Sequence, residues 1–314
     1  MISIPHKAKH FFLVIIKILI VCAAVYYVCN HFNSDDTLDF HLIVKYISLK
    51  TFFVLIVFSG LNWLLEIFKW KYLVSTFQRI SFLNATAQSL GSLTASIFTP
   101  NRVGEYGAKA LYFSKKNTKQ VVLLNFIGNS FQMLVTTIFG VLGIYFYFIN
   151  ANKTTFFDYY VVNLKSFGLF VFLFGILVFS FRNYHFFGIS ITKILKKISR
   201  YSIDFYFKIL VFSTLRYVVF FLQFLYLILV FEVDISFNVA LATIATMYLM
   251  VSIIPTIPFI DVPVKGSVAL ILFNVAAAEE WKIAAVVVVM WFFNLVLPML
   301  GGSFFVWHYN PFKR

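Results

Sequence analysis

Two short stretches of the sequence combine an acid, a base four residues later, and nearby glycine. The stretch NRVGEYGAKALYF holds Glu105 and Lys109, and the stretch DVPVKGSVALILF holds Asp261 and Lys265. An acid followed by a base at i, i+4 places both groups on one helix face in the favourable orientation. Bases of this kind bind anions, and the acids orient them or accept protons. These residues and Arg102 are therefore candidates for contact with an anionic ligand.

The remainder of the chain is too apolar for a soluble protein. Of 314 residues, 61% are hydrophobic, 20% are aromatic and only 12% are charged, whereas a soluble domain is about one quarter charged. The mean hydropathy is +0.89. Runs of roughly 20 apolar residues are typical of membrane-spanning helices. Such runs lie at approximately 11–29, 52–74, 86–99, 121–149, 163–181, 208–231, 238–257 and 282–306.

The distribution of lysine and arginine predicts the orientation of these runs. The formal net charge is +14, and the basic residues collect in alternate loops. Because lysine and arginine mark cytoplasmic loops, we expect a multi-pass membrane protein with both termini in the cytoplasm. The basic segments are 69–79, 115–119 and 182–208, and the acidic or neutral loops are 153–158, 232–234 and 279–280.

Two segments must enter the membrane and return on the same side. Segments 69–79 and 115–119 are both basic, so residues 86–113 between them form a hairpin. The run 86–99 is about 21 Å long at 1.5 Å per residue, which is short of the roughly 30 Å hydrocarbon core and favours re-entry. Residues 238–273 form the matching hairpin from the other side. The expected backbone breaks are Pro100, Gly104 and Gly107 in the first hairpin and Pro258, Pro263 and Gly266 in the second.

We therefore predict an all-α, polytopic membrane fold with two inverted repeats, each built around a broken re-entrant hairpin. The repeats cover about 52–149 and 208–306 within one integral membrane domain, 1–314. Six full spans plus two hairpins and eight transmembrane helices both satisfy the charge pattern. Broken helices that meet near the midplane of inverted repeats are a recurring plan in transporters.

Polar residues inside the long runs extend the candidate site. Asn129 and Gln132 lie on one helix face with Asn125 and Thr136. Arg216 and Asn294 lie inside other apolar runs, where polar side chains are costly and usually functional. Hydrogen bonding between helices is the structural alternative for the amides, and snorkelling to the interface is the alternative for the charges. We expect these residues to line a path for the ligand.

The sequence lacks the motifs of the common enzyme classes. It contains no phosphate-binding loop, no H-E-x-x-H pair, no G-x-S-x-G turn and no cysteine–histidine metal spacing. We therefore expect no enzyme activity, no cofactor and no metal. The positive charge sorts to one side of the membrane, so nucleic acid is not an expected partner.

The hairpin sequences resemble a known family. FTPNRVGEYGAKALYF is similar to the P-G-R-x-G-E signature of the lysylphosphatidylglycerol synthase transmembrane-region family, a flippase-like membrane domain. EIFKWKYL and WFFNLVLPMLGG resemble two further stretches of that family. The second family signature, P-x-P-G-G-x-G-x-x-E, is not kept. The aminoacyl-transferase domain of some relatives is missing, so lysyl transfer is not expected.

The resemblance implies movement of a lipid or lipid-linked anionic head group between leaflets, and with it a location in the bacterial inner (plasma) membrane. The expected partners are membrane lipids or lipid-linked glycans, and homo-oligomerisation is left open. Two alternatives remain. One is a membrane-embedded, lipid-modifying transferase with Glu105 as its base, and the other is a non-catalytic partner of another membrane protein.

Overall fold

The structure is a computed structural model that describes residues 40–150, 185–186, 189–190, 197–254, 256, 261–274 and 278–309. The chain divides into two compact units, Met1–Asn150 with Leu210–Arg314, and Ala151–Ile209. The predicted runs 11–29 and 163–181 lie outside the described residues. In the second unit, β1 (His185–Phe186) and β2 (Ile189–Ser190) form a short antiparallel pair. All other elements of the described residues are helical.

Four helices of the described residues are long and apolar enough to cross a membrane. This agrees with four of the predicted runs and supports a polytopic membrane protein. The first three are α3 (Leu49–Ser75), α6 (Thr118–Asn150) and α9 (Ile203–Val230). The fourth is a continuous helix made of α12 (Glu280–Trp291), η5 (Phe292–Val296) and α13 (Leu297–His308). A short helix, α2 (Phe40–Tyr46), precedes α3.

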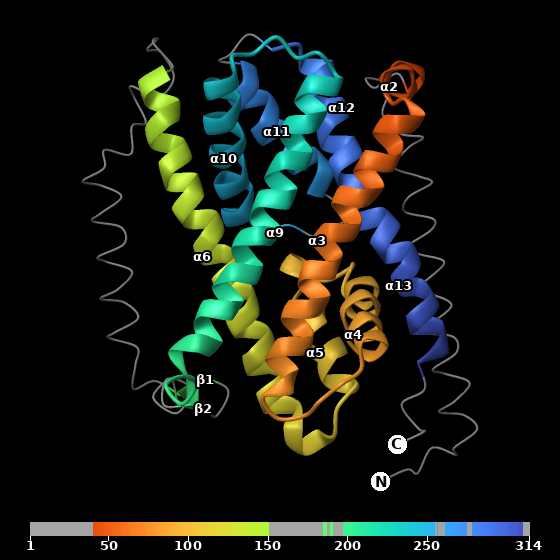
Figure 1. Cartoon of the computed structure of the whole chain (residues 1–314), viewed down its shortest axis with the longest axis vertical. Coiled ribbons are helices and arrows are strands. Elements are labelled where there is room, and N and C mark those ends of the chain that lie inside the picture. Colours follow the sequence, from red (N-terminus) through yellow and green to blue (C-terminus); the bar gives the residue numbers. More distant parts are fainter. Residues whose placement is uncertain are drawn as a thin grey trace. The chain divides into compact units, whose positions relative to one another are not determined.

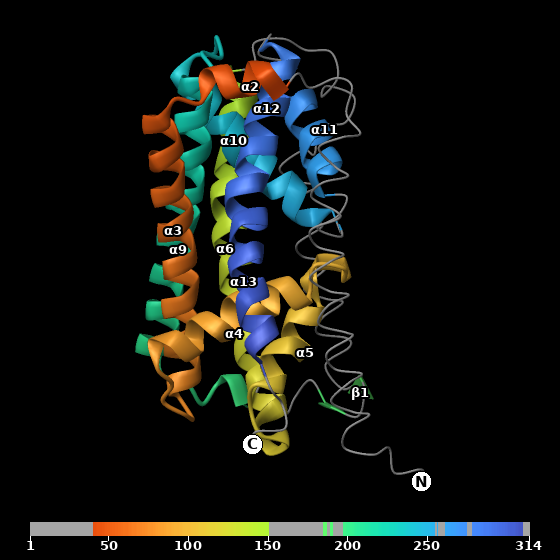
Figure 2. The same cartoon turned by 90° about the vertical axis from the view of Figure 1, so that its right-hand side faces the viewer.

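The shorter helices form two hairpins at opposite ends of the long ones (Figures 1 and 2). The first consists of α4 (Phe82–Ala95), η1 (Pro100–Arg102) and α5 (Gly104–Leu111), and the second consists of α10 (Phe237–Ile253) and α11 (Asp261–Asn274). Their α-helices have 8 to 17 residues. They are therefore about 12–26 Å long, less than the roughly 30 Å hydrocarbon core. A further short turn, η2 (Lys115–Asn117), leads into α6.

The tips of the two hairpins meet through a pair of hydrogen bonds. The backbone N–H of Asn101 donates to the carbonyl of Thr256 over 2.7 Å, and the Thr256 N–H donates to Asn101 Oδ1 over 2.9 Å. The chain turns at this tip because Asn101 and Arg102 both adopt left-handed conformations, with φ of 46° and 56°. Asparagine tolerates this region, whereas arginine rarely enters it. Arg102 is therefore the strained residue of this tip, and its side chain lies between the two hairpins.

The structure corrects part of the predicted set of backbone breaks. Pro100 begins η1 and Gly104 begins α5, as a break at that point requires. Gly107, however, lies within α5, and Pro263 and Gly266 lie within α11, so these three do not interrupt a helix. Proline is tolerated in the first turn because its missing N–H has no helical acceptor there. Pro258 lies outside the described residues.

Small residues let the hairpins pack closely against the spans. A Cβ atom added to Gly143 of α6 would come within 2.9 Å of the Thr246 N–H nitrogen of α10. A Cβ atom added to Gly302 of α13 would come within 2.2 Å of the carbonyl oxygen of Leu90 in α4. Close backbone approach at small residues drives helix association in membranes. The main apolar core lies between α9, α10, α11 and α12 and includes the fully buried Phe231.

A π-helical segment interrupts the last span just before Pro298. Proline has no N–H, so the carbonyl of Asn294 four residues earlier loses its helical donor. The indole Nε1 of Trp63 donates to this carbonyl over 3.1 Å, and Ser59 Oγ donates to the carbonyl of Phe293 over 2.5 Å. Helix α3 therefore satisfies the carbonyls that the proline and the π segment leave without partners.

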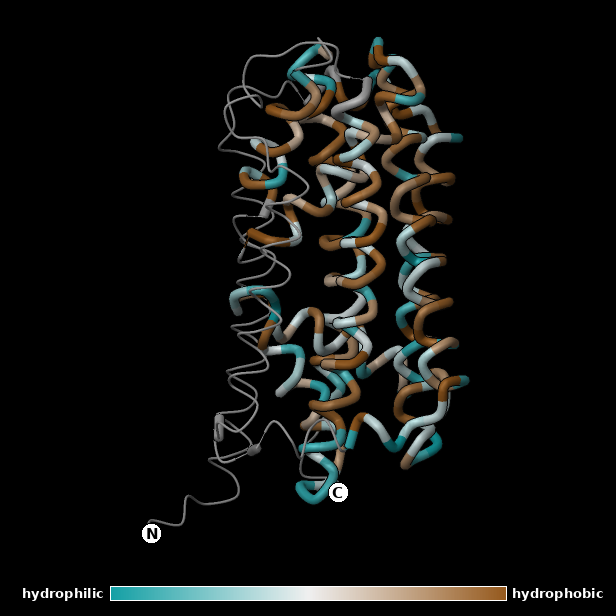
Figure 3. The backbone as a smooth tube through the Cα atoms, turned by 90° about the vertical axis from the view of Figure 1, so that its left-hand side faces the viewer, coloured by the Kyte–Doolittle hydropathy of each residue, from teal (hydrophilic) through white to brown (hydrophobic). Residues whose placement is uncertain are grey.

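The two ends of the first unit differ in charge. Most of the tube between the ends is apolar in Figure 3, and exposed large apolar side chains such as Phe53, Val57 and Phe126 cover the outer face. The end at the α3–α4 and α5–α6 turns exposes Arg79, Lys115, Lys116 and Lys119. The other end carries Glu232, Asp234, Glu279 and Glu280 together with the bases Lys45, Lys50 and Lys282, so it is not basic. There, hydrogen bonds from Lys282 and Trp281 lower the pKa of Glu279.

Candidate functional site

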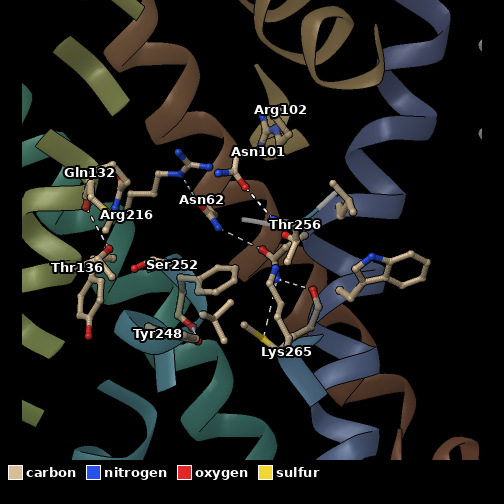
Figure 4. A pocket seen from close by; sticks show the side chains of 18 of the residues that line it. Asn62, Asn101, Arg102, Gln132, Thr136, Arg216, Tyr248, Ser252, Thr256 and Lys265 are labelled. Atoms are coloured by element: carbon tan, nitrogen blue, oxygen red, sulfur yellow. Dashed lines mark hydrogen bonds between the residues drawn. The ribbon is translucent and has the colours of Figure 1, made fainter. Parts of the chain in front are cut away.

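A cavity of about 570 Å³ lies where the two hairpins meet the spans. Arg102 of the first hairpin and Lys265 of the second lie on opposite sides of it, and Arg216 of α9 extends into it (Figure 4). Residues of α3, α6, α10 and η5 complete the lining. Of the hairpin charges selected from the sequence, Arg102, Glu105 and Lys265 line this cavity.

Glu66 of α3 is the centre of a cluster of cations. Its Oε2 accepts from Arg216 Nη1 over 2.5 Å and lies 2.8 Å from Lys69 Nζ, while its Oε1 lies 3.8 Å from Lys109 Nζ. The side chain of Glu66 is 7% exposed. Removing a buried carboxylate of this kind from its partners is costly, because each cation loses its compensating charge.

Glu105 of α5 is the second carboxylate of the cluster. Arg102 Nη2 lies 2.7 Å from its Oε2, and Lys109 Nζ lies 2.7 Å from its Oε1. The predicted i, i+4 pair of Glu105 and Lys109 is therefore formed. Lys109 also donates to Asn125 Oδ1 over 2.8 Å and lies 4.3 Å from the ring centroid of Trp70. The two carboxylates thus share Lys109, which joins α3 to the first hairpin.

The cations of the cluster form an inner and an outer pair. The side chains of Lys69 and Lys109 are 1% and 0% exposed, whereas those of Arg216 and Arg102 are 20% and 31% exposed and line the cavity. Lys109 was predicted to contact the ligand directly. It does not line the cavity but lies behind Glu105, because α5 turns that face toward α3 and α6.

The cluster is costly for a chain in a membrane. A lone cation at the centre of a helix costs about 2.5–3.5 kcal/mol on insertion scales. Here two carboxylates offset part of that cost for four cations, Lys69, Arg102, Lys109 and Arg216. Ionisable side chains inside membrane-spanning segments are rare, and they usually mark a binding site or a transport path.

A chain of amide side chains continues from Arg216 across the bundle. Arg216 Nε donates to Asn62 Oδ1 over 2.6 Å, and Asn62 Nδ2 donates to Asn294 Oδ1 over 3.2 Å. Asn294 Nδ2 then donates to Gln223 Oε1 over 2.9 Å. The predicted site residues Arg216 and Asn294 are therefore connected, and Asn62, which the sequence analysis did not select, is the link between them.

The polar face of α6 supplies another part of the lining. Asn129, Gln132 and Thr136 line the cavity as the helical spacing predicts, while Asn125 turns to Lys109. Asn129 Nδ2 donates to Tyr106 Oη over 3.1 Å, and Gln132 Nε2 donates to the carbonyl of Ser213 over 3.3 Å. The Gln132 Oε1 atom is buried and has no hydrogen-bond partner among the described residues.

The second hairpin contributes one described charge. Lys265 of α11 lines the cavity. The side chain of Asp261 lies outside the described parts of the structure, so the predicted pair with Lys265 stays a prediction. The charges that the structure describes at the site therefore come mainly from the first hairpin, α3 and α9.

Sequence reasoning missed Glu66 and Lys69. Lys69 was grouped with Lys71 and Arg79 as part of a cytoplasmic segment, but it is buried within α3 beside Glu66. The available signal was the acid and base three residues apart, which lie on one helix face inside an apolar run.

Comparison of the chain with protein-family models, with curated proteins and with solved structures gives no match. Among the described residues, no group of three or more His, Cys, Asp or Glu side chains could hold a metal ion.

Proposed function

We propose that the protein is a flippase-like transporter that moves a lipid, or a lipid-linked molecule, with an anionic head group between the leaflets of a membrane. The observation that carries this proposal is the position of Arg102 and Arg216, which face a cavity of about 570 Å³ at the junction of two opposed hairpins. Two guanidinium groups beside a partly polar space are suited to phosphate, which arginine binds in bidentate geometry.

The hairpin arrangement supports transport rather than simple binding. One hairpin enters from each end of the long helices, and their tips are joined only by the Asn101–Thr256 pair among the hydrogen bonds described. In transporters with inverted repeats, movement of one repeat against the other opens a central site alternately to the two sides. We assign the repeats to 52–149 and 208–306, and each contains one hairpin between two spans.

The roles of the site residues follow from their depth. Arg102 and Arg216 contact the head group, and Glu105 and Glu66, which are less exposed and also line the cavity, hold these arginines in place. Lys109 fixes the two carboxylates. The apolar part of the lining, which includes Phe220 and Val251, faces the glycerol or prenyl part of the cargo. We assign the basic end, which carries Arg79, to the cytoplasmic side of the bacterial inner membrane.

The test is transbilayer movement in reconstituted vesicles. Purified protein is inserted into vesicles with a trace of fluorescent phosphatidylglycerol, phosphatidic acid or phosphatidylcholine, and dithionite measures how fast inner-leaflet label becomes accessible. Wild-type protein is expected to accelerate at least one anionic lipid. Arg216→Gln reduces that rate at least tenfold, whereas Arg79→Gln, which removes an exposed arginine away from the cavity, leaves it unchanged.

Two results would remove this proposal. The first is equal movement of every lipid with and without protein. The second is recovery of a chemically altered lipid from the vesicles, measured by mass spectrometry, which would favour the transferase alternative with Glu105 as base.

A further inference from the structure

The charges around the cavity do not balance. Glu66 and Glu105 are the buried carboxylates among the described residues, and the four cations Lys69, Lys109, Arg102 and Arg216 depend on them. Lys265 follows Asp261 by four residues in the sequence, so this pair is counted as neutral. The cluster therefore has an excess of two positive charges.

The excess lies on Arg102 and Arg216, the two cations of the cluster that line the cavity beside Glu66 and Glu105. Lys69 is 2.8 Å from Glu66 and Lys109 is 2.7 Å from Glu105, so each buried lysine neutralises one carboxylate. Arg216 and Arg102 share the same carboxylates from the cavity side. Their two positive charges consequently have no anion of their own within the described residues.

The arginines also retain hydrogen-bonding capacity. Each guanidinium carries five N–H donors. Arg102 contacts Glu105 through Nη2 alone, and its Nε is buried without a hydrogen-bond partner among the described atoms. Arg216 uses Nη1 for Glu66 and Nε for Asn62. Each arginine therefore has donors left for an acceptor in the cavity.

Resting on the function proposed above, we infer that the cargo head group carries two negative charges on phosphate. A phosphate monoester or a diphosphate supplies one negative charge for each arginine, whereas the single charge of a phosphodiester leaves one of them uncompensated. The inference therefore separates lipid phosphates and diphosphates from the ordinary phosphodiester lipids of the bilayer, which share the same acyl chains.

The experiment compares two lipids with the same acyl chains whose head groups differ in charge, and uses pH to change that charge on one of them. Binding of dioleoyl phosphatidic acid and dioleoyl phosphatidylglycerol to the purified full chain in detergent is measured by displacement of a fluorescent phosphatidic acid. The second ionisation of a phosphate monoester lies near pH 6, so phosphatidic acid is doubly charged at pH 8.5 and singly charged at pH 5. Phosphatidylglycerol keeps one charge at both values, so the affinity ratio of the two lipids cancels titration of the protein that affects both lipids equally.

We expect phosphatidic acid to bind at least tenfold more tightly than phosphatidylglycerol at pH 8.5, and this preference to disappear at pH 5. Arg216→Gln and Arg102→Gln each reduce the preference toward unity, and Arg216→Lys, which keeps the charge, preserves much of it. Lys116→Gln, at an exposed position on the basic end, is the matched control that changes nothing.

Inorganic phosphate, tested in the same assay, distinguishes a soluble phosphate ligand from a lipid phosphate. Displacement at lipid-like concentrations supports a soluble phosphate ligand, displacement only by lipid supports a lipid head group, and both support a doubly charged site. Equal affinity for phosphatidic acid and phosphatidylglycerol at pH 8.5 overturns the inference. That result leaves the transport proposal intact if phosphatidylglycerol is moved in vesicles, so the two failures are distinguishable.

Discussion

Removal of the Glu66 carboxylate should be among the most destabilising single changes in the chain. Glu66→Gln keeps the shape of the side chain but leaves Lys69, Lys109 and Arg216 without the charge that lies 2.5–3.8 Å from each of them. Removing one partner of a buried ion pair costs about 3–5 kcal/mol. At about 2–4 °C per kcal/mol for a protein of this size class, the melting temperature should fall by about 6–20 °C.

The assay is thermal unfolding of the detergent-purified protein, followed by tryptophan fluorescence. Glu279→Gln is the control, because that carboxylate is 58% exposed and its pairing with Lys282 is screened by solvent. The double variant Glu66→Gln/Lys69→Met removes one cation together with the acid, so it should recover part of the loss. The reasoning is refuted if Glu66→Gln lowers the melting temperature no more than Glu279→Gln does.

Three further predictions use the same unfolding assay or hydrogen exchange. Trp63→Phe removes the donor to the Asn294 carbonyl and should lower the free energy of unfolding by about 1–3 kcal/mol. Trp281→Phe, which removes an indole bonded to an exposed carboxylate, should lower it less, and equal losses would contradict the account of the π segment. Gly143→Ala should destabilise the protein, because the added Cβ would lie 2.9 Å from the α10 backbone. Gly60→Ala, whose Cβ would have nothing within 4 Å, should be neutral or stabilising, and a larger loss of stability in Gly60→Ala than in Gly143→Ala would refute the packing argument. Asn101→Ala should speed backbone hydrogen exchange at Thr256, since it removes one of the two bonds between the hairpin tips; unchanged exchange would show that the tips are held by other contacts.

The hairpins could be predicted from sequence because two general constraints fix them. The positive charges at 69–79 and 115–119 require residues 86–113 to return to the side of entry, and the short apolar run 86–99 cannot cross the hydrocarbon core. In the structure the first hairpin begins four residues earlier than predicted, with α4 at Phe82, and ends with α5 at Leu111, while α10 and α11 cover 237–274 where 238–273 was predicted. The contacts of Glu105 with Lys109 followed from helical spacing alone.

The rest of the site depends on contacts between distant segments. Glu66 and Lys69 lie in an otherwise apolar run, and their importance follows from Arg216 and Lys109, which are 150 and 43 positions away from Glu66 along the chain. The π segment at η5 follows from Pro298 and from donors on α3. Gly107 was misassigned because glycine inside a helix looks the same in sequence as glycine at a break.

The central claim is that a water-accessible cavity with excess positive charge lies within the membrane. Thr136 lines this cavity, and the next residue, Thr137, does not, so cysteine at each position forms a matched pair once Cys22 and Cys29 are replaced by alanine. The reaction rates of a negatively charged and a positively charged methanethiosulfonate reagent are measured on the protein in vesicles. We predict that Thr136→Cys reacts at least tenfold faster with the anionic reagent, that this preference falls in Arg216→Gln, and that Thr137→Cys reacts slowly with both. No reaction at position 136, or faster reaction with the cationic reagent, would contradict the account.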